Sequence, residues 1–81
     1  MVNKMSATSD AVLDIATDYL GPAAIILLER QTKFHMKNLN FAEITPSDCE
    51  ELAKWVELAS AMFIEQDLAN EFAGKIKRLA L

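Results

Sequence analysis

Apolar residues in this chain recur every three or four positions, which is the spacing of one face of an α-helix and not the alternation of a strand. Between residues 8 and 20 the repeating positions are Val12, Ile15, Ala16 and Tyr19. The same spacing returns in the segment that follows and again after residue 45. We therefore expect an all-α protein that folds as a compact three- to four-helix bundle.

Turn and cap residues separate these segments. Gly21 fits the left-handed position after a helix, and Pro22 fits the first turn of the next one. Asn38 can also adopt the left-handed conformation and end a helix. Thr45 followed by Pro46 gives the clearest start signal, an N-cap before a proline in the first turn. The helices predicted from these signals cover about 8–20, about 22–38 and the region from 46 onward.

The number of helices after residue 45 stays open. No Gly or Pro lies between residues 47 and 73, and the apolar spacing continues from Trp55 to Ile76. A turn near Ile64 to Asp67 would give a third and a fourth helix. The alternative is one merged helix of about 34 residues, roughly 50 Å long, which would need a second copy as its packing partner.

The size of the chain indicates a single domain that gains from a partner. An 81-residue chain buries only about 60% of its unfolded surface, yet 52% of its residues are apolar. Cys49 is the only cysteine, so an internal disulfide is excluded and a reducing compartment is favoured. We expect a flexible tail at 1–7, a helical domain at 8–81, and association into a homodimer.

Charge and hydropathy argue against two classes of partner. The net charge of −4 disfavours nucleic acid and anionic membranes, because both require clustered Lys and Arg. The longest uninterrupted apolar run covers residues 23–28, whereas a spanning helix needs about 20 apolar residues. The first residues lack the apolar segment of a signal peptide. We therefore expect a cytoplasmic protein that binds neither nucleic acid nor a membrane.

The residues for common catalytic and cofactor sites are missing from the sequence. His35 and Cys49 are the only residues of their types, so neither a metal site nor a catalytic triad is expected. Two glycines, Gly21 and Gly74, cannot form a phosphate-binding loop. Cys49 could have a lowered pKa near a helix N-terminus, but packing is the preferred interpretation. The sequence thus predicts a protein that is not an enzyme and binds no cofactor.

Aromatic and methionine side chains in the second half of the chain form the candidate interface. Such residues are enriched at the centres of protein–protein interfaces. Ordinary core packing is the alternative interpretation for all of them. The predicted interface residues are Trp55, Leu58, Met62, Phe63, Phe72 and Ile76.

Two sets of charged residues are candidates for recognition. The acidic set recurs every four residues, and the cationic set shares one face near the end of the second predicted helix. The two sets could pair within one chain or between two copies, and plain solvation is the alternative. The residues are Asp10, Asp14 and Asp18 in the acidic set, and Arg30, Lys33 and Lys37 in the cationic set.

Several short strings carry a resemblance to other proteins. They are Leu20-Gly-Pro-Ala-Ala, Leu28-Glu-Arg-Gln, Ile44-Thr-Pro-Ser-Asp, Leu52-Ala and Ala73-Gly-Lys-Ile. The chain resembles small uncharacterised helical domains that occur alone or appended to bacterial and cyanobacterial signalling proteins. The resemblance covers about residues 10–80, transfers no catalytic residue, and implies a regulatory or scaffolding module.

The leading functional hypothesis is a helical protein–protein interaction or regulatory module that acts through an apolar face and self-associates. The alternative is a carrier of a small apolar ligand, a lipid or a pigment, within the bundle. A third hypothesis, nucleic-acid binding through the cationic set, is disfavoured by the acidic charge of the chain.

Overall fold

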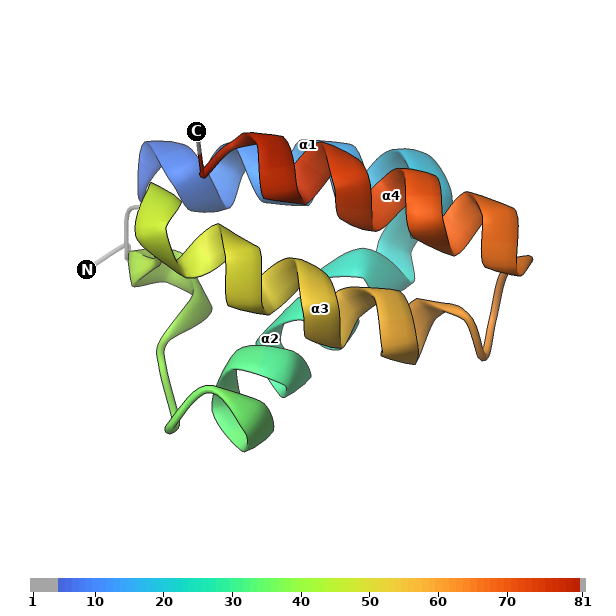
Figure 1. Ribbon diagram of the computed structural model, residues 1–81. Coiled ribbons are helices and arrows are strands. Elements are labelled where there is room, and N and C mark those ends of the chain that lie inside the picture. Colours follow the sequence, from blue (N-terminus) through green and yellow to red (C-terminus); the bar gives the residue numbers. More distant parts are fainter. Residues whose placement is uncertain (1–4, 81) are drawn as a thin grey trace.

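Helices make up most of residues 5–80, which is the part of the chain that the computed structural model describes (Figure 1). The four α-helices are α1 (Ala7–Leu20), α2 (Ala24–His35), α3 (Cys49–Ser60) and α4 (Gln66–Arg78). Three short 3-10 helices join them: η1 (Gly21–Ala23), η2 (Phe41–Glu43) and η3 (Pro46–Asp48). The all-α bundle is confirmed. The predicted tail falls largely on residues 1–4, outside the described part, and Ala7 already belongs to α1.

Ser6 begins α1 and also ties the linker before α3 to it. The Ser6 hydroxyl oxygen accepts a hydrogen bond from the Ser9 amide at 3.0 Å, as an N-cap does. The same hydroxyl donates to the Ile44 carbonyl at 2.8 Å, and the Ser6 amide donates to the Ala42 carbonyl at 2.8 Å. Phe41 and Ile44 are buried beneath these bonds. These hydrogen bonds and the two buried side chains hold the linker against the bundle.

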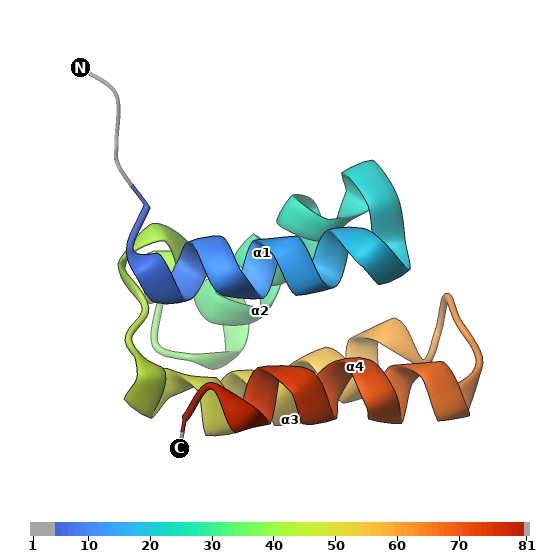
Figure 2. The ribbon, with the colours of Figure 1, turned by 90° about the horizontal axis from the view of Figure 1, so that it is seen from above.

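Gly21 turns the chain back between α1 and α2. Its φ of 60° and ψ of −141° lie in a region that residues with a Cβ rarely adopt. The Gly21 amide donates to the Thr17 carbonyl, and η1 then leads into α2. Seen from above, α2 runs back beneath α1 (Figure 2). The turn predicted at Gly-Pro is confirmed.

α2 ends earlier than the sequence indicates. Its last residue is His35, and both Lys37 and Asn38 have positive φ values, 57° and 58°. The Asn38 amide donates to the Lys33 carbonyl at 3.2 Å, which closes the end of the helix. Asn38 is left-handed as predicted. The predicted extension of the helix to residue 38 is wrong, because the left-handed pair already begins at Lys37.

The segment Ala7–His35 is long and apolar enough to span a membrane, judged by length and composition alone. Its most apolar 18-residue window has a mean hydropathy of 1.6. The length of the uninterrupted apolar run at 23–28 is therefore not sufficient to exclude a membrane-spanning helix. In the structure this segment is not one straight helix, since it bends at η1 and places Val12, Ala16 and Leu28 in the core. Only 28% of that window is buried in the structure, so length and composition alone make this segment weak evidence for a span.

The boundary between α3 and α4 lies in a turn that neither glycine nor proline marks. α3 ends at Ser60, whose carbonyl accepts hydrogen bonds from the Phe63 and Ile64 amides at 2.8 and 2.9 Å. α4 begins at Gln66 and runs antiparallel to α3 (Figure 1). The predicted break is confirmed, and the merged helix is wrong.

The core lies where the four helices meet. α3 and α4 are in extensive contact with each other, and α1 and α2 cover them. Phe72 of α4 is fully buried and stacks on Tyr19 of α1, with ring centroids 5.0 Å apart. The largest fully buried apolar side chains are Phe72, Leu28, Ile44, Leu52, Ile76, Val12 and Val56. This packing leaves the opening between α2 and the α3–α4 turn uncovered.

Candidate interaction surface

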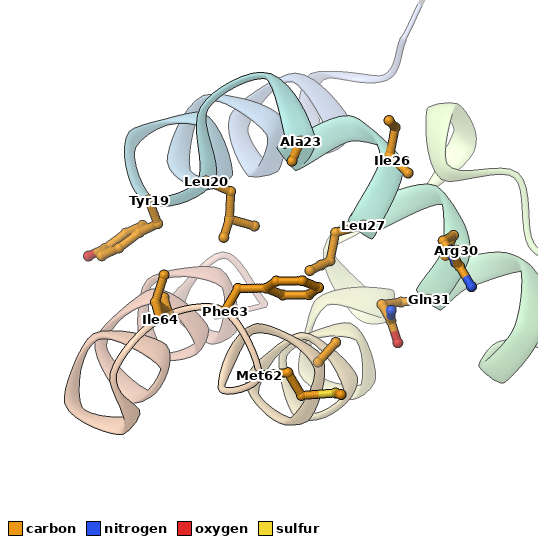
Figure 3. Close-up of a pocket in the computed structure, with 11 residues that line it drawn as sticks. Tyr19, Leu20, Ala23, Ile26, Leu27, Arg30, Gln31, Met62, Phe63 and Ile64 are labelled. Atoms are coloured by element: carbon orange, nitrogen blue, oxygen red, sulfur yellow. The ribbon is translucent and has the colours of Figure 1, made fainter.

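An open groove of about 660 Å³ lies at the end of the bundle where the chain turns twice (Figure 3). One wall comes from the end of α1, η1 and α2, and the other from the end of α3 and the turn that follows. The residues that line it are Tyr19, Leu20, Ala23, Ile26, Leu27, Arg30, Gln31, Ala59, Met62, Phe63 and Ile64. Most of them are apolar, and we call this space the apolar groove.

Three large apolar side chains of the apolar groove are exposed to solvent. Met62 is 82% exposed, Phe63 74% and Ile26 60%. The Phe63 ring lies across the groove toward Leu27, whereas Met62 and Ile26 lie at its opposite edges (Figure 3). Exposed apolar residues are ordinary when scattered, but a contiguous group around one hollow is typical of a binding surface.

A second aromatic feature lies farther along α2 and α3. The His35 ring stacks on Trp55 at a centroid distance of 4.4 Å and an interplanar angle of 14°. The Trp55 indole N–H donates to a Glu51 carboxylate oxygen at 3.3 Å. Trp55 is therefore half-buried within its own chain, and Leu58, one turn further along α3, is exposed. His35 is exposed, and its ring covers one face of the indole.

The predicted interface residues have different surroundings in the structure, and Trp55 is half-buried between the exposed and the buried ones. Met62 and Phe63 lie together in the apolar groove, and Leu58 is exposed on α3. Phe72 and Ile76 have no exposed surface, because the inner face of α4 packs them against the core. The prediction that these two form an interface is wrong, and ordinary core packing is the correct interpretation for them.

Sequence reasoning missed one wall of the apolar groove. Leu20, Ala23 and Ile26 lie on the wall opposite Phe63, and none of them was among the predicted interface residues. Ile26 is exposed while its neighbours Leu27 and Leu28 are buried. The apolar run at 23–28 could have predicted this exposed wall. A short helix that is apolar on all sides has more apolar surface than one small bundle can cover.

The two charged sets are not paired with each other. Asp10, Asp14 and Asp18 are exposed on α1, and Arg30 and Lys33 are exposed on α2. Within residues 5–80 the structure shows an ion pair only between Lys75 and Glu71, at 4.0 Å, four residues apart.

Asp18 is the member of the acidic set that influences a cation of α4. A hydrogen bond with Tyr19, and then the charges of Glu71 and Asp18, raise the pKa of Lys75. Lys37 lies beyond the end of α2 in the left-handed turn. The expectation that it shares a helix face with Arg30 and Lys33 is therefore wrong.

Cys49 is a packed residue with no sign of reactivity. It is fully buried at the start of α3, and its thiol lies 3.8 Å from the Thr45 carbonyl. Burial, and then the charge of Asp48, raise the pKa of the Cys49 thiol. A thiol pKa lowered by the helix N-terminus is thus contradicted. In the described part of the chain, no three His, Cys, Asp or Glu side chains are placed to hold a metal ion.

No protein-family model, curated protein or solved structure matches this chain. The resemblance to helical domains of signalling proteins stays a prediction, as do the cytoplasmic location and the homodimer. The fold and the apolar groove are the observations from which a function can be argued.

Proposed function

We propose that this protein is a non-catalytic interaction module that binds another protein chain in the apolar groove. The observation that carries this proposal is the exposure of Met62, Phe63 and Ile26 around one hollow, beside a core whose residues are buried. Apolar surface in water costs about 25 cal/mol per Å² relative to its burial. A partner that covers these side chains would recover that free energy.

The composition of the groove supports a protein as the partner. Aromatic and methionine side chains supply the centre, and polar groups of Arg30 and Gln31 lie toward one end, as in interfaces with an apolar centre and a polar rim. A standard interface covers about 800 Å² on each partner. That is roughly a seventh of the 5328 Å² of accessible surface on this chain. One interface would therefore dominate the behaviour of so small a domain.

The proposed role is regulatory or scaffolding, as the resemblance to signalling-protein domains implies. It needs no cofactor and no metal, and we expect it in the cytoplasm. The protein would act by presenting a shaped apolar surface whose occupancy depends on the concentration of the partner.

Site-specific photo-crosslinking tests this proposal directly. A benzophenone amino acid in place of Phe63 lies in the groove, and the same substitution at Leu68 is the control. Leu68 is also an exposed apolar residue, at 42%, but it lies on α4 outside the groove. Irradiation in the native cells should give a protein adduct at position 63 and far less at position 68. Equal adduct yields at the two positions, or none at position 63, would contradict the proposal.

A small apolar ligand is the second candidate occupant. The volume of about 660 Å³ falls within the roughly 300–1,000 Å³ of small-molecule sites. The groove is open at the surface, however, and does not enclose a ligand within the bundle as a carrier would. Native mass spectrometry of the purified protein distinguishes the two, because a carrier would retain extra bound mass.

A further inference from the structure

We infer that the partner segment held in the apolar groove is an amphipathic helix, whose apolar face fills the groove and whose Asp or Glu side chain pairs with Arg30. This inference rests on the proposed function and adds the conformation and the chemistry of the bound segment. Two observations carry it: the internal hydrogen bonding of the groove walls, and the single cation among the described residues that line the groove.

The walls of the apolar groove offer few backbone groups to a bound chain. The turn wall covers residues 61–64, and its four amides all donate to carbonyls of α3, at 2.8–3.3 Å. On the opposite wall, the Gly21 and Ala24 amides also donate within the chain. An extended peptide in the groove would therefore find no free backbone donor along residues 61–64.

A helix is the conformation that suits such walls. Its backbone N–H and C=O groups bond to each other, so only its side chains need partners in the groove. An extended segment would instead bury unpaired backbone groups, which costs free energy. An amphipathic helix in an apolar groove is a recurring mode of peptide recognition, and its anchors are spaced at i, i+3 or i+4, and i+7. We therefore expect this spacing in the bound segment.

Arg30 determines the charge that the bound helix needs. It is the one charged residue among the described residues that line the groove, and it lies at the opposite end from Tyr19 and Ile64 (Figure 3). Its side chain is exposed and has no ion pair among residues 5–80. An apolar segment alone would take water from the guanidinium without replacing its hydrogen bonds, whereas a carboxylate can accept two of them side by side.

Charges outside the groove oppose an acidic segment only weakly. The charged residues nearest to Arg30 along α2 are Glu29 and Lys33, both exposed and of opposite sign. The net charge of −4 is spread over the whole chain, and salt at physiological ionic strength screens charges beyond about 8 Å. The contact with Arg30 itself therefore dominates the electrostatics of a segment bound in the groove.

Selection from a displayed library of random peptides tests the inference without a known partner. The peptides have about 16 residues, roughly four helical turns, and the target is the full chain. Peptides that bind Phe63→Asp equally well are discarded, because that variant places a carboxylate in the apolar groove. The remaining peptides should share apolar residues at i, i+3 or i+4, and i+7, with an Asp or Glu at a fixed distance from them and no proline between them. Circular dichroism shows whether Phe63→Asp keeps the helical fold, and Met62→Asp is a second groove variant.

Charge reversal at Arg30 tests the ion pair. A selected peptide, labelled with fluorescein, should bind Arg30→Glu about tenfold or more weakly than the wild type in fluorescence anisotropy, because two carboxylates then meet. The same peptide with Lys in place of its acidic residue should prefer Arg30→Glu. Arg78→Glu, the same reversal on α4 outside the groove, is the matched control and should bind both peptides as the wild type does.

The outcomes separate this inference from the proposed function. Selected peptides that depend on Phe63 but carry prolines or strictly alternating apolar residues would overturn the helix. Equal affinities for the wild type and Arg30→Glu would overturn the ion pair. In both cases the groove would remain a surface that binds a protein chain. Failure to select any peptide that distinguishes the wild type from Phe63→Asp and Met62→Asp would contradict the proposed function as well.

Discussion

Phe72 and Phe63 have the same side chain and opposite surroundings. Phe72 is fully buried and stacked on Tyr19, whereas Phe63 is 74% exposed in the apolar groove. Burial of an aromatic ring is among the largest single contributions to the stability of a small domain. A ring that is mostly exposed contributes little to folding, and the proposed interface would give Phe63 a role in binding instead.

Truncation of each ring separates the two roles. Phe72→Ala should cost about 3–5 kcal/mol of unfolding free energy, because it leaves a cavity in the core. Phe63→Ala should change it by about 0.5 kcal/mol or less, as exposed substitutions do. Urea unfolding at a concentration low enough to keep the chain monomeric measures both. Similar losses for the two variants would contradict the assignment of Phe63 to the surface.

The pH dependence of stability tests the environment of Cys49. Burial raises the pKa of its thiol in the folded state above that in the unfolded state, about 8.5. As pH rises through that value, the unfolded chain loses the proton first, so the contribution of Cys49 to stability falls. The difference in unfolding free energy between wild type and Cys49→Ala should therefore narrow from about pH 7 to about pH 9.5. A difference that stays constant over this range would show that the thiol is not perturbed by burial.

At the scale of the helices, residues with special backbone conformations were the reliable guides. Gly21 and Asn38 were predicted to be left-handed, and both have positive φ. The α3–α4 boundary was harder, because the sequence there keeps helical spacing without a glycine or proline. The chain turns at Phe63 because α4 packs back along α3, which is a tertiary effect that a local pattern does not record.

Alanine substitutions at the two glycines test whether backbone conformation determines where the helices end. Gly21→Ala should destabilise the protein by about 1–3 kcal/mol, since its backbone conformation is strained for any residue with a Cβ. Gly74→Ala should stabilise it by about 0.4–1 kcal/mol, because Gly74 lies inside α4 and nothing lies within 4 Å of the added Cβ. Thermal or urea unfolding measures both. A loss at Gly74, or no change at Gly21, would contradict the description of these elements.

The apolar groove was only partly predictable from the sequence, because it too depends on tertiary packing. The sequence predicted Met62 and Phe63, which line the apolar groove, as interface residues, but it grouped them with the buried Phe72 and Ile76, since all four are large apolar residues at helical spacing. Which stripe faces inward depends on how four helices meet, and periodicity within one helix does not contain that information. The same limit explains why the α2 side of the groove was missed.

At the scale of the whole molecule, one domain combines a filled core with an unfilled groove at one end. The core residues alone account for the fold, and no described buried side-chain nitrogen or oxygen lacks a hydrogen-bond partner. Of the exposed large apolar side chains in the described part of the chain, Ile26, Met62 and Phe63 line the apolar groove, whereas Phe34, Leu58 and Leu68 lie outside it. Under the proposed function, a chain that covered the groove would add to the stability of so small a domain.

Methionine oxidation tests the covering of the groove most directly, since Met62 is 82% exposed and Met36, in the core, is 7% exposed. In dilute purified protein, peroxide should oxidise Met62 quickly and Met36 slowly. In the native cells, the account predicts that Met62 becomes protected several-fold while Met36 is unchanged. Peptide mass spectrometry gives both rates from one sample. Equal oxidation of Met62 in the dilute and cellular samples would show that nothing covers the groove, and would contradict the account.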